Sequence, residues 1–223
     1  MGLKQQIQEK PEKFRLFFGL YNRFLGHNKI RIKGQSKLLI QSAMLKGTRI
    51  HIEGNQNVVE IRSLTKMNGS SIFIKGNNNK IIIDERNGFE ECVLWMEDDG
   101  NEIRIGEHNR FFKNTHLAAL EGTKIVVLED GLFAPGVEMR TSDSHSILNM
   151  DGERMNPAKD IFVGKHVWIG AGSVLLKGSS IPDESIIGMN SMVNKKLDEK
   201  NSLYVGSPVK KVKTGVTWDS KRR

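Results

Sequence analysis

Aliphatic side chains in the second half of the chain recur at every sixth position. The series holds for six repeats without a slip: Val163, Ile169, Leu175, Ile181, Ile187 and Val193. Four places after each lies a mostly small residue: Val167, Ser173, Ser179, Ser185, Ser191 and Leu197. A step of six is not the 3.6-residue period of a helix. It predicts a parallel β-helix of triangular cross-section, in which the aliphatic residues fill the interior and three hexapeptides close a coil of about 18 residues.

The first half of the chain carries a looser repeat. The unit Gly-x-x-Ile-x-[Ile/Val] occurs four times, and successive units lie 22, 31 and 22 residues apart: Gly47, Gly69, Gly100 and Gly122. Three of these units are followed by a second motif: GNQN from Gly54, GNNN from Gly76 and GEHN from Gly106. Gly and Asn tolerate positive φ at tight corners and are poor in helix interiors. We therefore predict a coil of short strands here as well.

Two stretches break the phase of the repeats, at 81–99 and at 139–160. Insertions in a solenoid emerge as loops on one face, so both are predicted to be loop insertions. The predicted organisation is a helical segment at 1–28, a β-helix domain at 29–207 and a basic C-terminal tail at 208–223 that is frayed apart from Trp218.

The predicted N-terminal helix is amphipathic. Its apolar residues recur at spacings of three or four: Phe14, Phe17, Phe18, Tyr21, Phe24 and Leu25. Such a helix caps the open end of the coil or binds another subunit, and a membrane-surface role is the less favoured reading.

Charge and cysteine content narrow the class of protein. The chain of 223 residues has 34 Lys and Arg against 26 Asp and Glu, a net charge of +8 that favours polyanionic partners. The single cysteine, Cys92, excludes a disulfide framework within the chain and a cysteine-built zinc site. No apolar run approaches the ~18 residues of a membrane span, and the first residues do not resemble a secretory signal. The expected compartment is the cytoplasm.

Four segments carry a resemblance to a known family: TSDSHSI from Thr141, NPAKDIFVGKHVWIGAGSVLLKG from Asn156, SIIGMNSMVNKKL from Ser185 and VGSPVKKV from Val205. The chain resembles the hexapeptide-repeat, left-handed parallel β-helix acyltransferases, and most of all the capsular and surface polysaccharide O-acetyltransferases, with galactoside and maltose acetyltransferases as relatives. Specific motifs carry the resemblance from about 125 to 213, and the repeats alone carry it from 30 to 125.

The resemblance implies acetyl-CoA as acyl donor, a homotrimer with the donor groove between two subunits, no metal and no nucleic-acid partner. His145 matches the loop histidine that acts as general base, and a histidine side chain with its ordinary pKa near 6.5 can accept a proton at neutral pH. Trp168 matches an active-site tryptophan. Asp143 either orients the ring or the loop, or is a plain turn residue. Asn114 and His116 are weaker candidates for holding the acceptor, and His166 is expected to face solvent.

The resemblance also implies the donor site. The residues expected to bind the donor fall into three groups. Backbone groups come from Gly170, Ala171 and Met189. Near the nucleotide lie Asn194 and Lys195, and near the phosphates lie Lys210 and Lys213. Met189 departs from the family, because relatives commonly have alanine there. A backbone contact survives that change, although the longer side chain could reshape the groove.

The leading hypothesis is an acetyl-CoA-dependent O-acetyltransferase that acts on a carbohydrate hydroxyl, with an acidic capsular or surface polysaccharide suited to the basic chain. Two alternatives stay open, an N-acetyltransferase of an amino-sugar nucleotide and a non-catalytic β-helix that binds a polyanion. A metal-dependent hydratase of the γ-type carbonic anhydrase class is disfavoured, because no two of the six histidines have the expected His-x4-His spacing.

Overall fold

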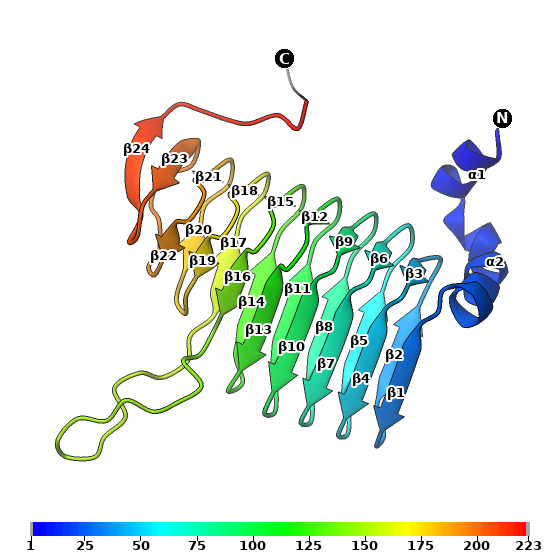
Figure 1. The fold of residues 1–223 in the computed structure, drawn as a ribbon, viewed down its shortest axis with the longest axis horizontal. Coiled ribbons are helices and arrows are strands. Elements are labelled where there is room, and N and C mark those ends of the chain that lie inside the picture. The colour runs from blue at the N-terminus through cyan, green and yellow to red at the C-terminus, as the bar shows by residue number, and fades with distance from the viewer. Residues whose placement is uncertain (1, 222–223) are drawn as a thin grey trace.

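Three parallel sheets form the sides of a long solenoid, and the chain visits them in turn (Figure 1). The structure is a computed structural model that describes residues 2–221. The predicted all-β, parallel β-helix fold is confirmed. We call the three sheets A, B and C in the order in which the chain enters them.

Each sheet takes every third strand as far as β22, after which β23 and β24 both join sheet C. Sheet A contains β1 (Lys29–Lys33), β4 (Arg49–Glu53), β7 (Ser71–Lys75), β10 (Val93–Glu97), β13 (His116–Leu120), β16 (Glu138–Arg140), β19 (Val174–Leu175) and β22 (Met192–Val193). Sheet B contains β2 (Lys37–Ile40), β5 (Val58–Ile61), β8 (Lys80–Ile83), β11 (Glu102–Ile105), β14 (Lys124–Val127), β17 (Ile161–Val163) and β20 (Ser180–Ile181). Sheet C contains β3 (Met44–Lys46), β6 (Lys66–Asn68), β9 (Gly88–Glu90), β12 (Arg110–Phe111), β15 (Leu132–Phe133), β18 (Trp168–Ile169), β21 (Ile186–Ile187), β23 (Ser202–Val205) and β24 (Lys210–Thr214).

The interior is a column of apolar side chains stacked coil upon coil. Side chains alternate between the two faces of a strand, so every second residue points inward. Phe89, Phe111 and Phe133 are buried and stack with ring centroids 4.8 and 4.3 Å apart. Coil length changes along the column: Arg49 pairs with Ser71, 22 residues later, whereas strands of the later coils pair 18 residues apart. The looser and stricter sequence repeats are therefore two coil sizes of one solenoid.

Buried asparagines connect the corners of successive coils in the first half. The backbone N–H of Asn79 donates to Oδ1 of Asn57 at 2.9 Å, and the N–H of Asn101 donates to Oδ1 of Asn79 at 2.9 Å. The side-chain amide of Asn79 in turn donates to the carbonyl of Asp98 at 2.9 Å. The motifs rich in Gly and Asn thus satisfy backbone groups that the turns would otherwise leave unpaired inside the protein.

The structure differs from the prediction at residues 81–99. These residues complete β8 and form β9 and β10, and Val93 pairs with Ser71 in an ordinary 22-residue coil. The spacing of 31 between two sequence units arises because Gly69 precedes a strand of sheet A, whereas Gly100 precedes a strand of sheet B. The repeat moves to the next face, and no loop is inserted. A long loop does leave the solenoid between β16 and β17, within the predicted 139–160 region (Figure 1).

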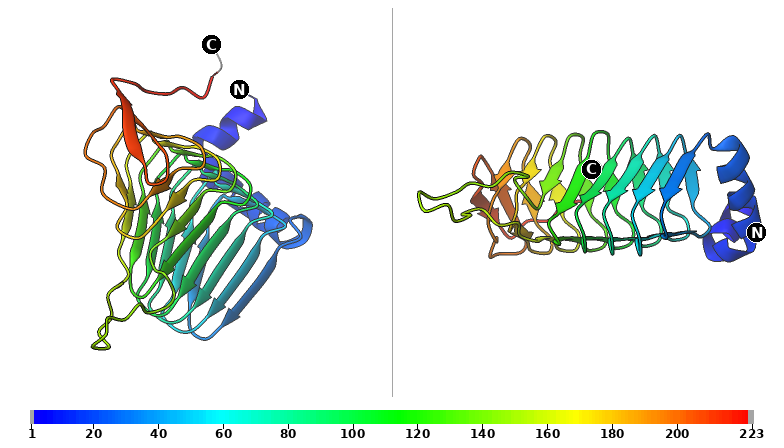
Figure 2. Two further views of the ribbon diagram at one scale, coloured as in Figure 1. Left: turned by 60° about the vertical axis from the view of Figure 1, so that its left-hand side comes forward. Right: turned by 90° about the horizontal axis from the view of Figure 1, so that it is seen from below.

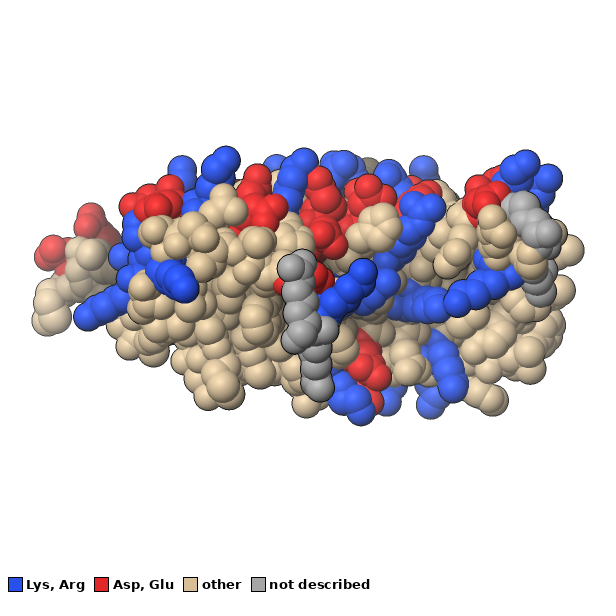
Figure 3. All heavy atoms as spheres, turned by 90° about the horizontal axis from the view of Figure 1, so that it is seen from above, with Lys and Arg blue, Asp and Glu red and all other residues tan. Residues whose placement is uncertain are grey.

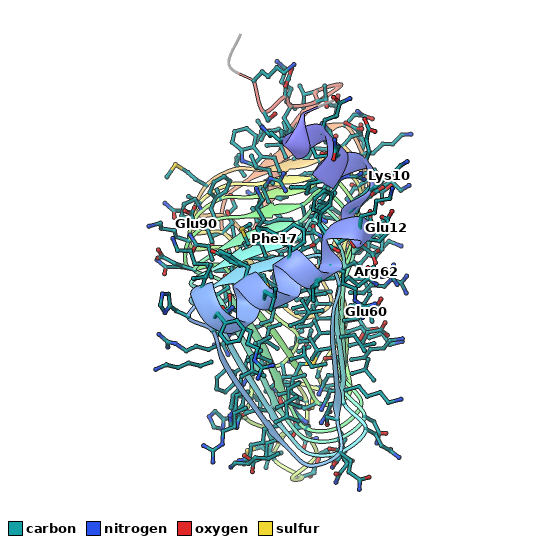
Figure 4. The ribbon with its side chains drawn as sticks, turned by 90° about the vertical axis from the view of Figure 1, so that its right-hand side faces the viewer. Lys10, Glu12, Phe17, Glu60, Arg62 and Glu90 are labelled. Carbon is teal, nitrogen blue, oxygen red and sulfur yellow. The ribbon has the colours of Figure 1, made fainter. Side chains whose placement is uncertain are left out.

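The N-terminal segment lies across the open end of the solenoid (Figures 2 and 4). It consists of α1 (Leu3–Glu9), a 3-10 turn at Pro11–Phe14, α2 (Arg15–Leu20) and a π-helical turn at Tyr21–Leu25. Asn22 holds it to β3, donating to the carbonyl of Ala43 and accepting from the N–H of Leu45, both at 2.9 Å. Within the described residues, none of the helices has the length and apolar character needed to cross a membrane.

The C-terminal segment is more ordered than predicted. β24 pairs antiparallel with β23 and closes that end of sheet C. The chain then turns back along the solenoid, where Trp218 stacks on His166 with ring centroids 4.3 Å apart. The tail residues are therefore docked on sheet C, and the expected frayed tail is corrected to a strand followed by a returning segment.

Candidate active site

The loop between β16 and β17 is held by one asparagine at its base. Asn156 is buried, and its Oδ1 accepts the N–H of Ile147 at 2.7 Å. Its Nδ2 donates to the carbonyl of His145 at 2.8 Å and to Oδ2 of Asp143 at 2.6 Å. One side chain thus fixes both sides of the turn that carries His145.

Charged pairs fasten the same loop to the neighbouring coils. Lys177, in the corner after β19, binds Asp143 and donates to the carbonyl of Asn156 at 3.0 Å. Arg154 makes a bidentate pair with Glu121 at 2.6 and 2.9 Å. The hydrogen bonds from Lys177 and then Asn156 lower the pKa of Asp143, and those from Arg154 and Ser142 lower the pKa of Glu121. Both carboxylates are held in the charged form that makes these bonds.

His145 itself is exposed, and among the described residues no hydrogen bond holds its imidazole ring. Asp143 bonds to Asn156 and Lys177, so it orients the loop rather than the His145 ring. Because the backbone of His145 is fixed and its ring is open to solvent, the ring can contact a group of a bound molecule.

Trp168 lies on a different face of the solenoid. It begins β18 in sheet C with 38% of its surface exposed, in line with Leu132 on one side and Ile186 on the other. The ring of Trp218 from the C-terminal tail lies 6.4 Å away and is tilted by 49°. The loop of His145 joins sheets A and B and projects from the edge of the solenoid away from the tail (Figures 1 and 2). One chain therefore presents the two candidate catalytic side chains on separate faces.

His166 does not face solvent as expected, because the tail covers it. Its Nδ1 lies 2.7 Å from Oδ2 of Asp130, and its Nε2 lies 3.1 Å from the carbonyl of Trp218. Trp218 Nε1 donates back to the carbonyl of His166 at 2.9 Å. Burial alone would lower the pKa of His166, but the hydrogen bonds to Asp130 and Trp218, together with the charges of Glu184 and Asp130, outweigh it and raise that pKa.

His116 and Asn114 lie on the side of sheet A and at the corner before it. His116 is half-buried, with Nδ1 3.7 Å from Glu138, and burial followed by the charge of Arg140 lowers its pKa. Asn114 has a φ of 59°, which explains its place at a tight corner. Neither residue contacts the His145 loop in any interaction described for the chain.

The corner formed by Gly170, Ala171 and Met189, which we call the donor corner, has the features needed to bind the narrow pantetheine arm of CoA. A Cβ at Gly170 would lie 2.5 Å from the backbone nitrogen of Met189, so the two corners pack with no room for a side chain. Among the described residues, the N–H groups of Ala171 and Met189 have no acceptor, while the Ala171 carbonyl accepts from Asn190 at 2.8 Å. Two unpaired donors on adjacent coils fit the carbonyl groups of a pantetheine arm.

The remaining predicted donor residues are divided between two parts of the last coils. Asn194 and Lys195 follow β22 at the corner between sheets A and B, whereas Lys210 and Lys213 lie on β24 at the end of sheet C. The structure brings Gly170, Ala171 and Met189 together, but it separates these three residues from Asn194 and Lys195 by the width of sheet A.

The sequence prediction missed the residues that support the site. Lys177 was indistinguishable from a surface lysine, and only the Asn-Pro pair at Asn156 marked a turn. The pairing of Glu121 with Arg154, 33 residues apart, follows no periodic signal. No group of His, Cys, Asp and Glu among the described residues is arranged to hold a metal ion.

A three-sided solenoid with hexapeptide coils and a histidine-bearing loop defines the class of hexapeptide-repeat acyltransferases. The solved structure of a polysialic acid O-acetyltransferase, OatWY, superposes with a TM-score of 0.77 at 30% identity, covering 88% of this chain and 90% of that one. The chain belongs to the hexapeptide-repeat acetyltransferase family. A second structure, the polysialic-acid-specific acetyltransferase NeuO, has a TM-score of 0.61 at 23% identity, covers 86% of this chain and 90% of that one, and shows the fold alone.

Curated proteins match by sequence over a shorter span. A polysialic acid O-acetyltransferase of Neisseria meningitidis is 33% identical over 109 residues, which are 48% of this chain and 51% of that protein. A galactoside O-acetyltransferase of Lactococcus lactis is 31% identical over 44% of this chain and 46% of that protein. These matches span about half the length of the curated relatives. No protein-family model matches the chain.

Proposed function

We propose that the protein transfers an acetyl group from acetyl-CoA to a hydroxyl group of a carbohydrate, and that the acceptor is an acidic capsular or surface polysaccharide. The observation that carries the proposal is an exposed histidine on a loop whose backbone is fixed by Asn156 and Lys177. The similarity of nine-tenths of a polysialic acid O-acetyltransferase to this chain supports the reaction class. The net charge of +8 suits an anionic acceptor.

In this mechanism His145 is the general base. Acetyl-CoA supplies the activated acetyl group as a thioester. His145 accepts the proton of the acceptor hydroxyl as the oxygen bonds to the acetyl carbon, and the proton then passes to the departing sulfur. Trp168 lines the acetyl pocket and offers its indole N–H. The unpaired N–H groups of Ala171 and Met189 hold the donor arm, and Lys210 and Lys213 attract its phosphates as point charges.

The working unit is a homotrimer. His145 and Trp168 lie on different faces of one chain, so a site that contains both needs His145 from one subunit and Trp168 from its neighbour. The same arrangement brings Asn194 and Lys195 of one subunit toward the donor corner of the next. Cyclic symmetry repeats the shared site at every interface.

The direct test is thiol release from acetyl-CoA in the presence of polysialic acid. We expect release by the native protein and none above background by His145→Ala, with the variant folded and still binding CoA. The protein's own thiol does not disturb the readout, because burial raises the pKa of Cys92 to about 12. Retained turnover in His145→Ala would remove His145 as the base.

The same product separates O-acetylation from N-acetylation of an amino sugar. An oxygen ester is cleaved by alkaline hydroxylamine, whereas an amide survives. We expect the acetyl label to leave the product with hydroxylamine. A label that persists would favour the N-acetyltransferase alternative, and CoA binding without transfer to any acceptor would favour a non-catalytic polyanion-binding solenoid.

A further inference from the structure

A groove runs along the outer face of sheet C between the N-terminal helices and the C-terminal tail. Its first part has a volume of 960 Å³ and lies between α1, α2 and the corners of the early coils. Its second part, of 700 Å³, lies under the returning tail. Both parts are lined by His108 and Arg110, so the two cavities adjoin at these residues, and we call them together the channel.

The floor of this channel contains a line of outward-facing residues, and the register of sheet C continues that line beyond the two cavities to the candidate active-site tryptophan, which lines neither of them. Successive strands of sheet C place the members of the line in register: Lys66, Gly88, Arg110, Leu132 and Trp168. Neighbouring strands lie about 4.8 Å apart, so Arg110 lies about 10 Å and Lys66 about 19 Å from Trp168 along the line.

The channel is positively charged where it approaches the N-terminal helices. Lys4, Lys66, Arg86 and Arg110 line it, and Figure 3 shows Lys and Arg gathered on this face toward the N-terminal end. Among the described residues, Lys66 and Arg110 have no carboxylate partner, whereas Arg86 pairs with Glu85 at 3.8 Å and donates to the carbonyl of Gln8 at 3.5 Å. Asp130, which lies under the tail, is paired with His166. Glu9 of α1 and Asp219 of the tail also line the two cavities, so it is the floor, at Lys66 and Arg110, that holds cations without a carboxylate partner in the described part of the chain.

Arg110 is held in a defined position. Its Nη1 donates to the carbonyl of Arg86 at 2.7 Å, and its side chain lies over Gly88, where a Cβ would come within 3.1 Å of the Arg110 Cδ. Glycine at position 88 leaves the space that this side chain occupies. A guanidinium that is fixed by a backbone carbonyl keeps its remaining N–H donors for a ligand.

We propose that this channel binds the acidic polysaccharide acceptor and delivers it to Trp168. The inference rests on the proposed function and adds the path of the polysaccharide. Its anionic sugars lie along the line from Lys66 to Trp168, and their carboxylates contact Arg110 and Lys66. An extended glycan advances by about one coil spacing per sugar. Arg110 is then within reach of a short oligomer at Trp168, whereas Lys66 requires a longer one.

The experiment measures the KM for sialic acid oligomers of increasing length in the native protein, Arg110→Gln and Lys66→Gln. Arg104→Gln and Lys80→Gln, which remove exposed cations from the outer face of sheet B, are the matched controls. We expect Arg110→Gln to raise the KM for long oligomers about tenfold, the loss of one charge-assisted hydrogen bond. The penalty of Lys66→Gln should begin only with oligomers about two sugars longer than those that reveal Arg110→Gln.

A second measurement without acetyl-CoA separates this proposal from the proposed function. Polysialic acid binding is titrated calorimetrically to the same five proteins, with dextran as a neutral polymer. Weakened binding in the two channel variants alone supports the channel, even if no thiol is released and the proposed function fails. Thiol release that is equal in channel and control variants at every oligomer length, or equal binding of dextran, would overturn the channel.

Discussion

Asn156 is the residue on which the geometry of the His145 loop depends. It donates to the His145 carbonyl and to Asp143 and accepts from Ile147, so Asn156→Ala releases both sides of the turn. We expect kcat to fall by about a hundredfold, the cost of a base misplaced by about 1 Å. The KM for acetyl-CoA and the pH profile of kcat should stay unchanged, because His145 is still present. These quantities are measured by steady-state kinetics across pH.

The matched control is Asn149→Ala in the same loop. Asn149 bonds only within the loop tip, to Glu153 and to the N–H of Asp151. A loss of kcat as large as that of Asn156→Ala would mean that any disturbance of the loop suffices, and the positioning role of Asn156 would be wrong.

At the scale of elements, the buried asparagine ladder stabilises the looser coils. Asn79→Ala removes the acceptor of the Asn101 N–H and leaves that buried group unpaired. We expect a loss of about 1–3 kcal/mol in the free energy of unfolding, measured by urea denaturation. Asn77→Ala is the control, since Asn77 accepts the Asn55 N–H on the exposed surface, where water can replace it. Equal losses in the two variants would contradict a role of burial.

The docking of the C-terminal tail is predicted to depend on pH. The pKa of His166 is raised in the folded protein, so the charged imidazole stabilises the docked tail below its ordinary pKa of about 6.5. That contribution is lost as the pH rises through the raised value. Limited trypsin cleavage after Lys213 should therefore become faster relative to the rest of the chain above neutral pH. His166→Gln should abolish this trend, and a trend unchanged in that variant would refute it.

The sequence predicted the coils but not the contacts between distant coils. The hexapeptide coils from Val163 onward can be predicted from the sequence, because an aliphatic side chain must fill the interior once in every six residues. The 31-residue spacing before Gly100 predicts an insertion, and this prediction is wrong, because a Gly-x-x-Ile unit that moves to the next face gives the same count as an inserted loop. Bonds such as Lys177 to Asp143 and Trp218 to His166 depend on which corners the coiling superposes, and no local pattern encodes them.

At the scale of the whole molecule, the proposed shared site predicts complementation between inactive variants. Trp168→Ala and His145→Ala each disable every site of a homotrimer. Each mixed trimer has one interface with both native residues, so about a third of the sites in mixed trimers freed of homotrimers should be active. Co-expressed variants, separated from homotrimers by differing tags and assayed for thiol release, test this. No recovered activity in mixed trimers would place His145 and Trp168 of a site on the same chain.

The returning tail also determines how the solenoid unfolds. Coils in such a protein contact only their neighbours, so an end coil can unravel alone and the damage can advance one coil at a time. Trp218 skips β23 and β21 and is fastened beside β18, on His166. Unravelling from that end must first break this fastening, which makes the last coils open together. The docked tail thus makes the unfolding of the coils at the donor-binding end cooperative instead of gradual, and it raises the barrier to that unfolding.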